Sequence, residues 1–225
     1  MKKINFIIPV LILFSCMHGG YNRDDDANYT AARDLYMQSL GAPDRERERL
    51  RAEIIRLSPD SEYGLFAKGW FSGRERRFKT ALDYYTRAIE LNSSEHVFHY
   101  NRSLIMMKHY ELTSDPASLE EAEMGLNRCL ELDPSYANAY FTRAEIKNIR
   151  RDYCGAIEDY SLVIRYNNKD SHAYYNRGLL KLTAESDYRG ALADAQAAVR
   201  LDPGYAAAFC LMGIARYHLG DRKGA

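Results

Sequence analysis

The stretch AYYNRGLLKLTAESDYRGALADAQAAVRLDPGY, residues 173–205, sets the register of the chain. Its opening residues, AYYNRG, have near-copies upstream: FHYNRS at 98–103 and AYFTRA at 139–144. In each copy an arginine is followed by a small residue, Gly178, Ser103 or Ala144. A motif repeated at this spacing predicts a structure built from repeated units.

Two series of small residues fix the period of the repeat. The first series is separated by 34, 41, 34 and 35 residues and comprises Gly69, Ser103, Ala144, Gly178 and Gly213. The second is separated by 41, 34, 35 and 34 residues and comprises Ala81, Ala122, Ala156, Ala191 and Ala225. Two independent series of small residues in one register predict internal repeats.

These residues resemble the tetratricopeptide repeat (TPR) family, whose pattern runs Trp-x₂-Leu-Gly-x₂-Tyr, Ala-x₃-Phe and Pro. In residues 173–205 the places of the pattern are taken in order by Tyr174, Gly178, Ala191, Ala195, Ala198 and Pro203. The resemblance covers roughly residues 62–225. It implies an all-α fold, a TPR-type helix–turn–helix solenoid that forms a right-handed superhelical array.

The predicted array occupies residues 62–225, as about four units and a final half unit. Residues 30–61 resemble a divergent helical cap, in which Leu50, Ile54 and Leu57 share one face of an amphipathic helix. The insertion ELTSDPA at 111–117 is expected to form a loop. Ser118 and Glu121 have the spacing of a capping box, so the next helix is expected to restart there.

The N-terminus, MKKINFIIPVLILFSC, combines two lysines, a short apolar run and a cysteine. The apolar run would be about 16 Å long as a helix, too short for a hydrocarbon core of about 30 Å, and is typical of a signal peptide. LFSC resembles a bacterial lipobox, which implies cleavage after residue 15 and lipidation of Cys16. The predicted organisation is therefore a signal peptide at 1–15 and a flexible tether at 16–29.

Composition argues against several functional classes. The formal net charge is zero, so no basic excess favours nucleic acid. The remaining cysteines, Cys129, Cys154 and Cys210, match no zinc spacing and are expected to be small apolar fillers. His96 and His99 suit metal geometry but lack a clear third ligand. No metal, cofactor or catalytic residue is predicted, and the chain is not expected to be an enzyme.

The family resemblance implies a concave groove lined by the first helix of each unit. Amides there can both donate and accept hydrogen bonds with a peptide backbone, and aromatic residues add rigid contact area. The predicted peptide-binding residues are Phe66, Trp70, Tyr100, Asn101, Leu104, Phe141, Thr142, Glu145, His172, Tyr175, Asn176 and Leu179.

The arginines after the amide places, Arg102, Arg143 and Arg177, have two readings. They pair with acidic residues such as Glu131 or Glu158, or they capture an acidic partner. Some family members bind chaperone C-terminal carboxylates with a clamp of Lys, Asn, Asn, Lys and Arg. This chain does not match the clamp. An Asn, Asn101 or Asn176, fills one place, while the other places hold Phe66, Trp70, Asn138 and Thr142.

Together these patterns predict a membrane-tethered scaffold that binds protein or peptide partners. A role in cell-envelope assembly is implied only by the resemblance to bacterial proteins of this architecture. Met17 after the cysteine favours the outer over the inner bacterial membrane. One alternative is the N-terminal module of a larger enzyme or sensor that continues past Ala225, where a second helix should begin. Self-association through the terminal helix is a third possibility.

Overall fold

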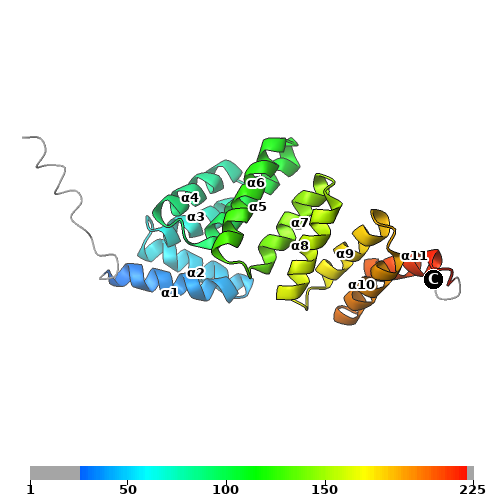
Figure 1. The fold of residues 1–225 in the computed structure, drawn as a ribbon. Coiled ribbons are helices and arrows are strands. Elements are labelled where there is room, and N and C mark those ends of the chain that lie inside the picture. The colour runs from blue at the N-terminus through cyan, green and yellow to red at the C-terminus, as the bar shows by residue number, and fades with distance from the viewer. Residues whose placement is uncertain (1–25, 222–225) are drawn as a thin grey trace, which may run out of the picture. The chain divides into compact units, whose positions relative to one another are not determined.

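The computed structural model describes residues 26–221. The predicted signal peptide, Cys16 and most of the tether lie outside this range. Within it the chain forms helices and no strands (Figure 1). The helices are α1 (Ala27–Gly41), α2 (Asp44–Leu57), α3 (Glu62–Arg74), α4 (Phe78–Leu91), α5 (His96–Thr113), α6 (Pro116–Leu132), α7 (Ala137–Ile149), α8 (Tyr153–Tyr166), α9 (Ser171–Thr183), α10 (Tyr188–Leu201) and α11 (Ala206–His218). In this range, no helix has both the length and the apolar content needed to cross a membrane.

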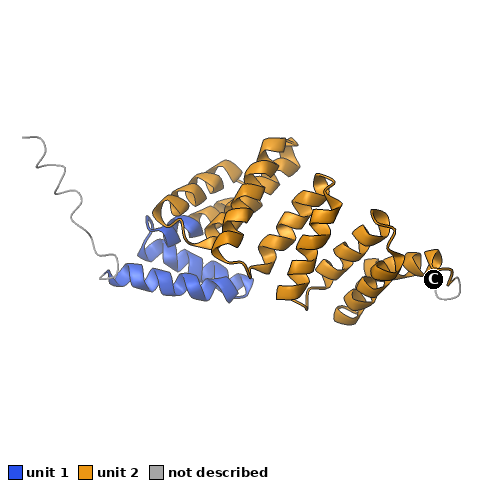
Figure 2. Ribbon diagram, in the orientation of Figure 1, with its two compact units in different colours: residues 1–67 blue, residues 68–225 orange. Residues whose placement is uncertain are grey.

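The chain divides into two compact units, residues 1–67 and 68–225, and the boundary falls inside α3 (Figure 2). The first unit contains α1, α2 and the start of α3. Its buried centre includes Tyr36, Ile54 and Phe66, none of which is exposed. The rings of Tyr36 and Phe66 meet edge to face with centroids 5.3 Å apart.

Helix α2 has the amphipathic character that its sequence predicts. Leu50 and Ile54 are buried, and Leu57 is half-buried. Its charged residues mostly face solvent, as the sequence pattern requires. Helix α1 begins directly after Asp26, whose carboxylate accepts a hydrogen bond of 2.8 Å from the backbone N–H of Asn28. Residues 27–29 of the predicted tether are therefore helical.

The second unit is a stack of helix pairs in which α5 packs on α6, α7 on α8 and α9 on α10. The small residues lie where the helices meet: Ser103, Ala144, Ala122, Ala156 and Ala191 are all buried. At Gly178 a Cβ atom would lie 3.0 Å from the Cβ of Asp194 on α10 and 3.2 Å from Leu211 on α11. Close helix approach therefore explains the period found in the sequence. The all-α solenoid is confirmed.

The expectation of a loop at 111–117 is wrong. Helix α5 runs to Thr113 and α6 begins at Pro116, so only Ser114 and Asp115 separate them. Ser114 has a left-handed backbone, with φ of 57°, and Asp115 caps α6 by accepting from the N–H of Ala117 at 3.1 Å. Because a left-handed residue followed by a capping aspartate makes a tight turn, the inserted residues lengthen both helices.

Ser118 is not the cap of α6, because it lies inside the helix. Its side chain is buried, and its hydroxyl lies 2.8 Å from Nδ1 of His109 and 3.3 Å from a carboxylate oxygen of Asp115.

The prediction for the cysteines holds only in part. Cys129 is buried, whereas Cys154 and Cys210 are exposed and therefore fill no interior space.

Candidate functional site

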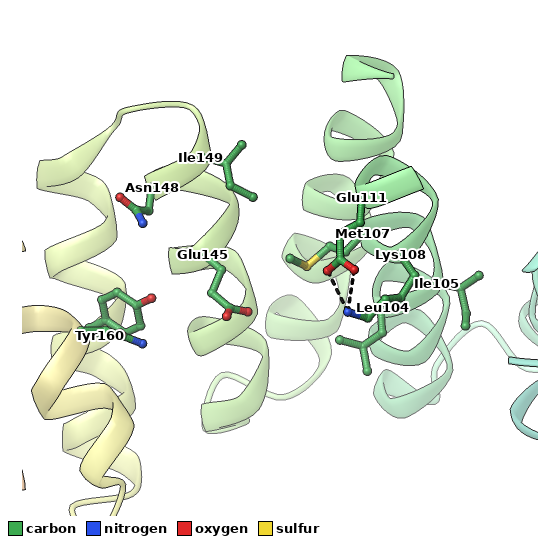
Figure 3. Close-up of a pocket in the computed structure, with 10 residues that line it drawn as sticks. Leu104, Ile105, Met107, Lys108, Glu111, Glu145, Asn148, Ile149 and Tyr160 are labelled. Atoms are coloured by element: carbon green, nitrogen blue, oxygen red, sulfur yellow. Dashed lines mark hydrogen bonds and ion pairs between the residues drawn. The ribbon is translucent and has the colours of Figure 1, made fainter. Parts of the chain in front are cut away.

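A cavity of about 460 Å³ opens between helices α5, α7, α8 and α9 (Figure 3). We call it the inner cavity. Its lining consists of Leu104, Ile105, Met107, Lys108, Glu111, Glu145, Asn148, Ile149, Tyr160 and Asn176. Leu104, Glu145 and Asn176 were predicted from the sequence, one from each of the first helices α5, α7 and α9. The structure brings these three together in one cavity.

A smaller cavity of about 170 Å³ lies at the beginnings of the same three first helices. We call it the outer cavity. It is lined by Tyr100, Asn138, Phe141, Thr142, Asp170 and His172. Four of these, Tyr100, Phe141, Thr142 and His172, are predicted groove residues. The outer cavity uses the early turns of α5, α7 and α9 and the inner cavity uses their later turns, so the two follow one another along the helices.

A third cavity, of about 390 Å³, shares Ile105, Lys108 and Glu111 with the inner cavity. Its other lining residues are Gly73, Arg76, Phe78 and Leu112. The hollow between the first helices therefore continues on the other side of α5.

Phe66 does not belong to the groove. It is fully buried in the first unit, against Tyr36 and beneath the guanidinium of Arg51, which lies 4.9 Å from its ring centroid. The prediction placed it by its position in the repeat pattern. Interior packing within the first unit takes up this side chain instead.

The other predicted residues lie outside the two cavities that α5, α7 and α9 form. The ring centroids of Trp70 and Phe71 lie 5.1 Å apart, and the guanidinium of Arg74 lies 4.8 Å from the centroid of the Trp70 ring. Tyr175 packs against Tyr205, with ring centroids 5.0 Å apart. Leu179 is half-buried.

Two polar residues of the predicted groove bond within their own helices. The side-chain amide of Asn101 donates to the carbonyl of Val97 at 2.8 Å. The hydroxyl of Thr142 donates to the carbonyl of Asn138 at 3.0 Å, and Thr142 is buried. Asn101 therefore has one of its two N–H donors engaged, and Asn176 is the predicted amide that lines a cavity.

The charges of the inner cavity are unevenly matched. Lys108 donates to both carboxylate oxygens of Glu111, at 2.7 and 2.8 Å, drawn as dashed lines in Figure 3. Burial raises the pKa of Glu145, and the nearby charge of Glu111 adds to this while Lys108 opposes it. Burial, helped by the charge of Glu145, also raises the pKa of Tyr160, whereas its hydrogen bond with Asn176 lowers it. The cavity therefore holds a carboxylate in surroundings that disfavour its charge.

The arginines pair with acids on the second helices, as one of the two readings expected, but with other partners. Arg143 bonds Asp159 at 2.7 and 2.8 Å, and Arg177 bonds Asp194 at 2.6 and 2.9 Å. Arg102 bonds Glu121 at 3.1 Å. Asp159 is the neighbour of the expected Glu158, while Glu131 pairs with Arg128 instead. These arginines join the two helices of a unit.

Sequence reasoning missed most of the inner cavity. Ile105, Met107, Lys108 and Glu111 extend α5 beyond Leu104, and Asn148 and Ile149 extend α7 beyond Glu145. Met107, Lys108 and Glu111 follow Leu104 by three, four and seven positions, which is the spacing of one helix face. That periodicity was the available signal. Tyr160 comes from a second helix, where the family pattern gave no signal.

Comparison with known proteins places this geometry in context. No family model matches the chain. It is 29% identical over 111 residues to rat (Rattus norvegicus) serine/threonine-protein phosphatase 5, covering 48% of this chain and 20% of that protein. It is 28% identical over 97 residues to Hsp70-Hsp90 organizing protein 3 of Arabidopsis thaliana, covering 43% and 16%. The chain thus spans about a fifth of the length of these curated relatives.

Solved structures share the fold at low sequence identity. The structure described as the functional characterization of Pseudomonas aeruginosa pilF matches with a TM-score of 0.72 and 16% identity over 88% of each chain. YrrB, described as a TPR protein with an unusual peptide-binding site, matches with a TM-score of 0.56 and 17% identity, over 83% of this chain and 91% of that one. The first TPR of Spaghetti (RPAP3), bound to the HSP90 peptide SRMEEVD, matches with a TM-score of 0.51 and 19% identity, over 56% of this chain and 94% of that one. The chain therefore has the fold of a TPR solenoid.

Proposed function

We propose that this protein is a membrane-tethered scaffold that holds a protein or peptide partner in the hollow between its first helices. One observation carries the proposal: the inner and outer cavities follow one another along α5, α7 and α9. An extended segment running along these helices would contact both cavities.

The lining has the chemistry of a binding surface. The inner cavity combines apolar side chains such as Leu104 and Met107 with the polar groups of Glu145 and Asn176. Binding sites commonly have this composition, in which apolar area supplies affinity and a few polar groups fix orientation. The volume of about 460 Å³ lies within the usual range for ligand sites, about 300–1,000 Å³.

Two of the structural neighbours are described as binding peptides, YrrB and the RPAP3 domain. Their fold lends support to peptide binding here. The partner class differs, however, from an acidic chaperone tail. This chain has Phe66 buried where the clamp needs a lysine, and its arginines Arg143 and Arg177 are engaged by Asp159 and Asp194.

The tether rests on the sequence MKKINFIIPVLILFSC. Lipidation at Cys16 would hold the helical units at a bacterial membrane, because several acyl chains anchor far more firmly than one. The proposed location is the cell envelope, at the outer membrane rather than the inner one. The proposed role is assembly of envelope components.

Site-specific crosslinking tests the groove. A photoreactive phenylalanine at Asn148, an exposed position that lines the inner cavity, should form an adduct with the partner in intact membranes. The matched control carries it at Asn168, an exposed turn position outside both cavities. Equal adducts at both positions, or none at Asn148, would contradict groove binding.

The intact mass of the membrane-extracted protein tests the anchor. A mass equal to that of a chain beginning at Cys16, increased by acyl groups, supports it.

A second candidate is a repeat module within a larger enzyme or sensor. The phosphatase relative favours it, since the matched region covers only 20% of that protein. A native mass well above that of residues 16–225 with its lipid would support this candidate over the free-standing scaffold. Self-association through α11 predicts instead a dimer whose proportion rises with protein concentration.

A further inference from the structure

Glu145 is a carboxylate whose neighbouring cations are already engaged. It lies half-buried on α7 and lines the inner cavity from the side opposite Lys108 and Glu111 of α5 (Figure 3). Among the described residues, none donates a hydrogen bond to Glu145 or forms an ion pair with it. Lys108, the cation that lines the same cavity, donates to both oxygens of Glu111.

The other cations of α7 and α9 are also paired. Arg143 and Lys147 both bond Asp159, and Arg177 and Lys181 both bond Asp194. With Glu111 balanced by Lys108, the inner cavity keeps one uncompensated negative charge, that of Glu145. An isolated carboxylate in such a place is costly, because burial removes water without supplying a partner.

We propose that the inner cavity accepts one lysine or arginine side chain of a partner segment, and that its cation pairs with Glu145. This inference rests on the groove function proposed above and specifies the chemistry of the partner. It makes the preferred segment basic and apolar, opposite in charge to an acidic tail.

The walls of the cavity suit the rest of such a side chain. The stems of lysine and arginine are aliphatic and lie readily along apolar surface while the charged end reaches a polar group. Leu104, Met107 and Ile149 supply apolar surface. Asn148 and Asn176 line the same cavity as Glu145, and their amide oxygens can accept hydrogen bonds, which suits a group with several N–H donors.

Selection from random peptides tests the proposed preference for a basic side chain. A phage-displayed library of random peptides is selected on the full chain in detergent, and the enriched peptides are synthesised. We expect them to carry one arginine or lysine among apolar residues. Replacing that arginine by citrulline, which has the same shape and no charge, should weaken binding about tenfold, between the effects of exposed and buried ion pairs.

The Glu145→Gln protein completes a double-mutant cycle. It should bind the arginine peptide about tenfold more weakly and should hardly distinguish arginine from citrulline. Glu158→Gln is the matched control, because Glu158 is exposed on α8 and lines neither cavity. That protein should bind like the wild type.

The outcomes separate this inference from the groove function. If Asn148→Trp blocks the enriched peptides, they bind in the groove. If those peptides nevertheless lack a basic residue, or bind the Glu145→Gln protein equally well, the role of Glu145 is overturned and groove binding stands. Enriched peptides that Asn148→Trp does not block would overturn both. A selection that enriches no peptide would likewise count against both.

Discussion

Arg177 and Asp194 join α9 to α10 through two parallel hydrogen bonds, 2.6 Å from Nη2 to Oδ1 and 2.9 Å from Nε to Oδ2. The Nζ of Lys181 lies 2.8 Å from the same Oδ2, and the side chain of Asp194 is only 6% exposed. Arg143, Lys147 and Asp159 repeat this arrangement between α7 and α8. The arginine of the repeated motif thus links the two helices of each of these units through a buried ion pair.

Substituting Asp194 should destabilise the second unit strongly. Asp194→Ala leaves Arg177 and Lys181 half-buried without their anion, a change that costs about 3 kcal/mol. Urea titration followed by circular dichroism measures the loss. Glu121→Ala is the control, because Glu121 is 49% exposed in its pair with Arg102, and its loss should stay below about 1 kcal/mol. Similar losses in the two proteins would contradict this role of the buried ion pair.

Two glycines of the first unit should respond in opposite ways to alanine. A Cβ at Gly64 would lie 2.1 Å from the carbonyl oxygen of Ser58 and 2.8 Å from the carbonyl carbon of Pro59, so the backbone must move. Gly64→Ala should therefore cost about 3 kcal/mol, the upper part of the range for overpacking. A Cβ at Gly41, the last residue of α1, meets nothing within 4 Å. Gly41→Ala should stabilise by about 0.5 kcal/mol, because alanine restricts the unfolded chain more than glycine does. Thermal unfolding of both proteins measures the contrast, and a neutral Gly64→Ala would contradict it.

The repeat register was predictable because it depends on close contact between helices. Ser103, Ala144 and Ala156 must be small wherever two helices meet, so a fixed interval in the sequence reports a fixed interval in space. The family resemblance, rather than the spacing, placed Leu104, Glu145 and Asn176 among the groove residues, and these three line the inner cavity.

The remaining features depend on details that a repeat pattern does not contain. A helix rotates by about 100° per residue, so an acid shifted by one position, Asp159 rather than Glu158, lies on a different face and changes the partner of Arg143. The turn at Ser114 required a left-handed residue without glycine, which gave no sequence signal. Phe66 fits the groove pattern but belongs to the packing of the first unit, which diverges from the repeat.

The three thiols of the described chain should differ in reactivity. Burial raises the pKa of Cys129 to about 12, so little of its reactive thiolate exists near neutral pH. Burial also keeps alkylating reagents from reaching this thiol. Iodoacetamide near pH 8 should therefore modify Cys154 and Cys210, which are exposed, and spare Cys129 until the protein is unfolded. Peptide mass spectrometry distinguishes the sites. Rapid modification of Cys129 in the folded protein would show that the α5–α8 interior opens readily.

Replacing Glu145 should stabilise the free protein in a pH-dependent way. Because burial raises its pKa in the folded state above the ordinary value of 4.5, the folded protein binds more protons than the unfolded one between these two values. The free energy of unfolding therefore falls as pH rises through this window, and the full penalty applies above the folded-state pKa. Glu145→Gln removes the penalty.

Urea midpoints of the wild-type and Glu145→Gln proteins between about pH 4 and 8 measure this effect. The variant should be more stable at neutral pH, and its advantage should vanish as pH falls below about 4.5. Glu158→Gln is the reference for removing an exposed carboxylate. A constant advantage at every pH would mean that the substitution acts through packing rather than charge. A saturating basic peptide should cancel the advantage at neutral pH, because its cation would stabilise the charged form of Glu145 in the wild type alone.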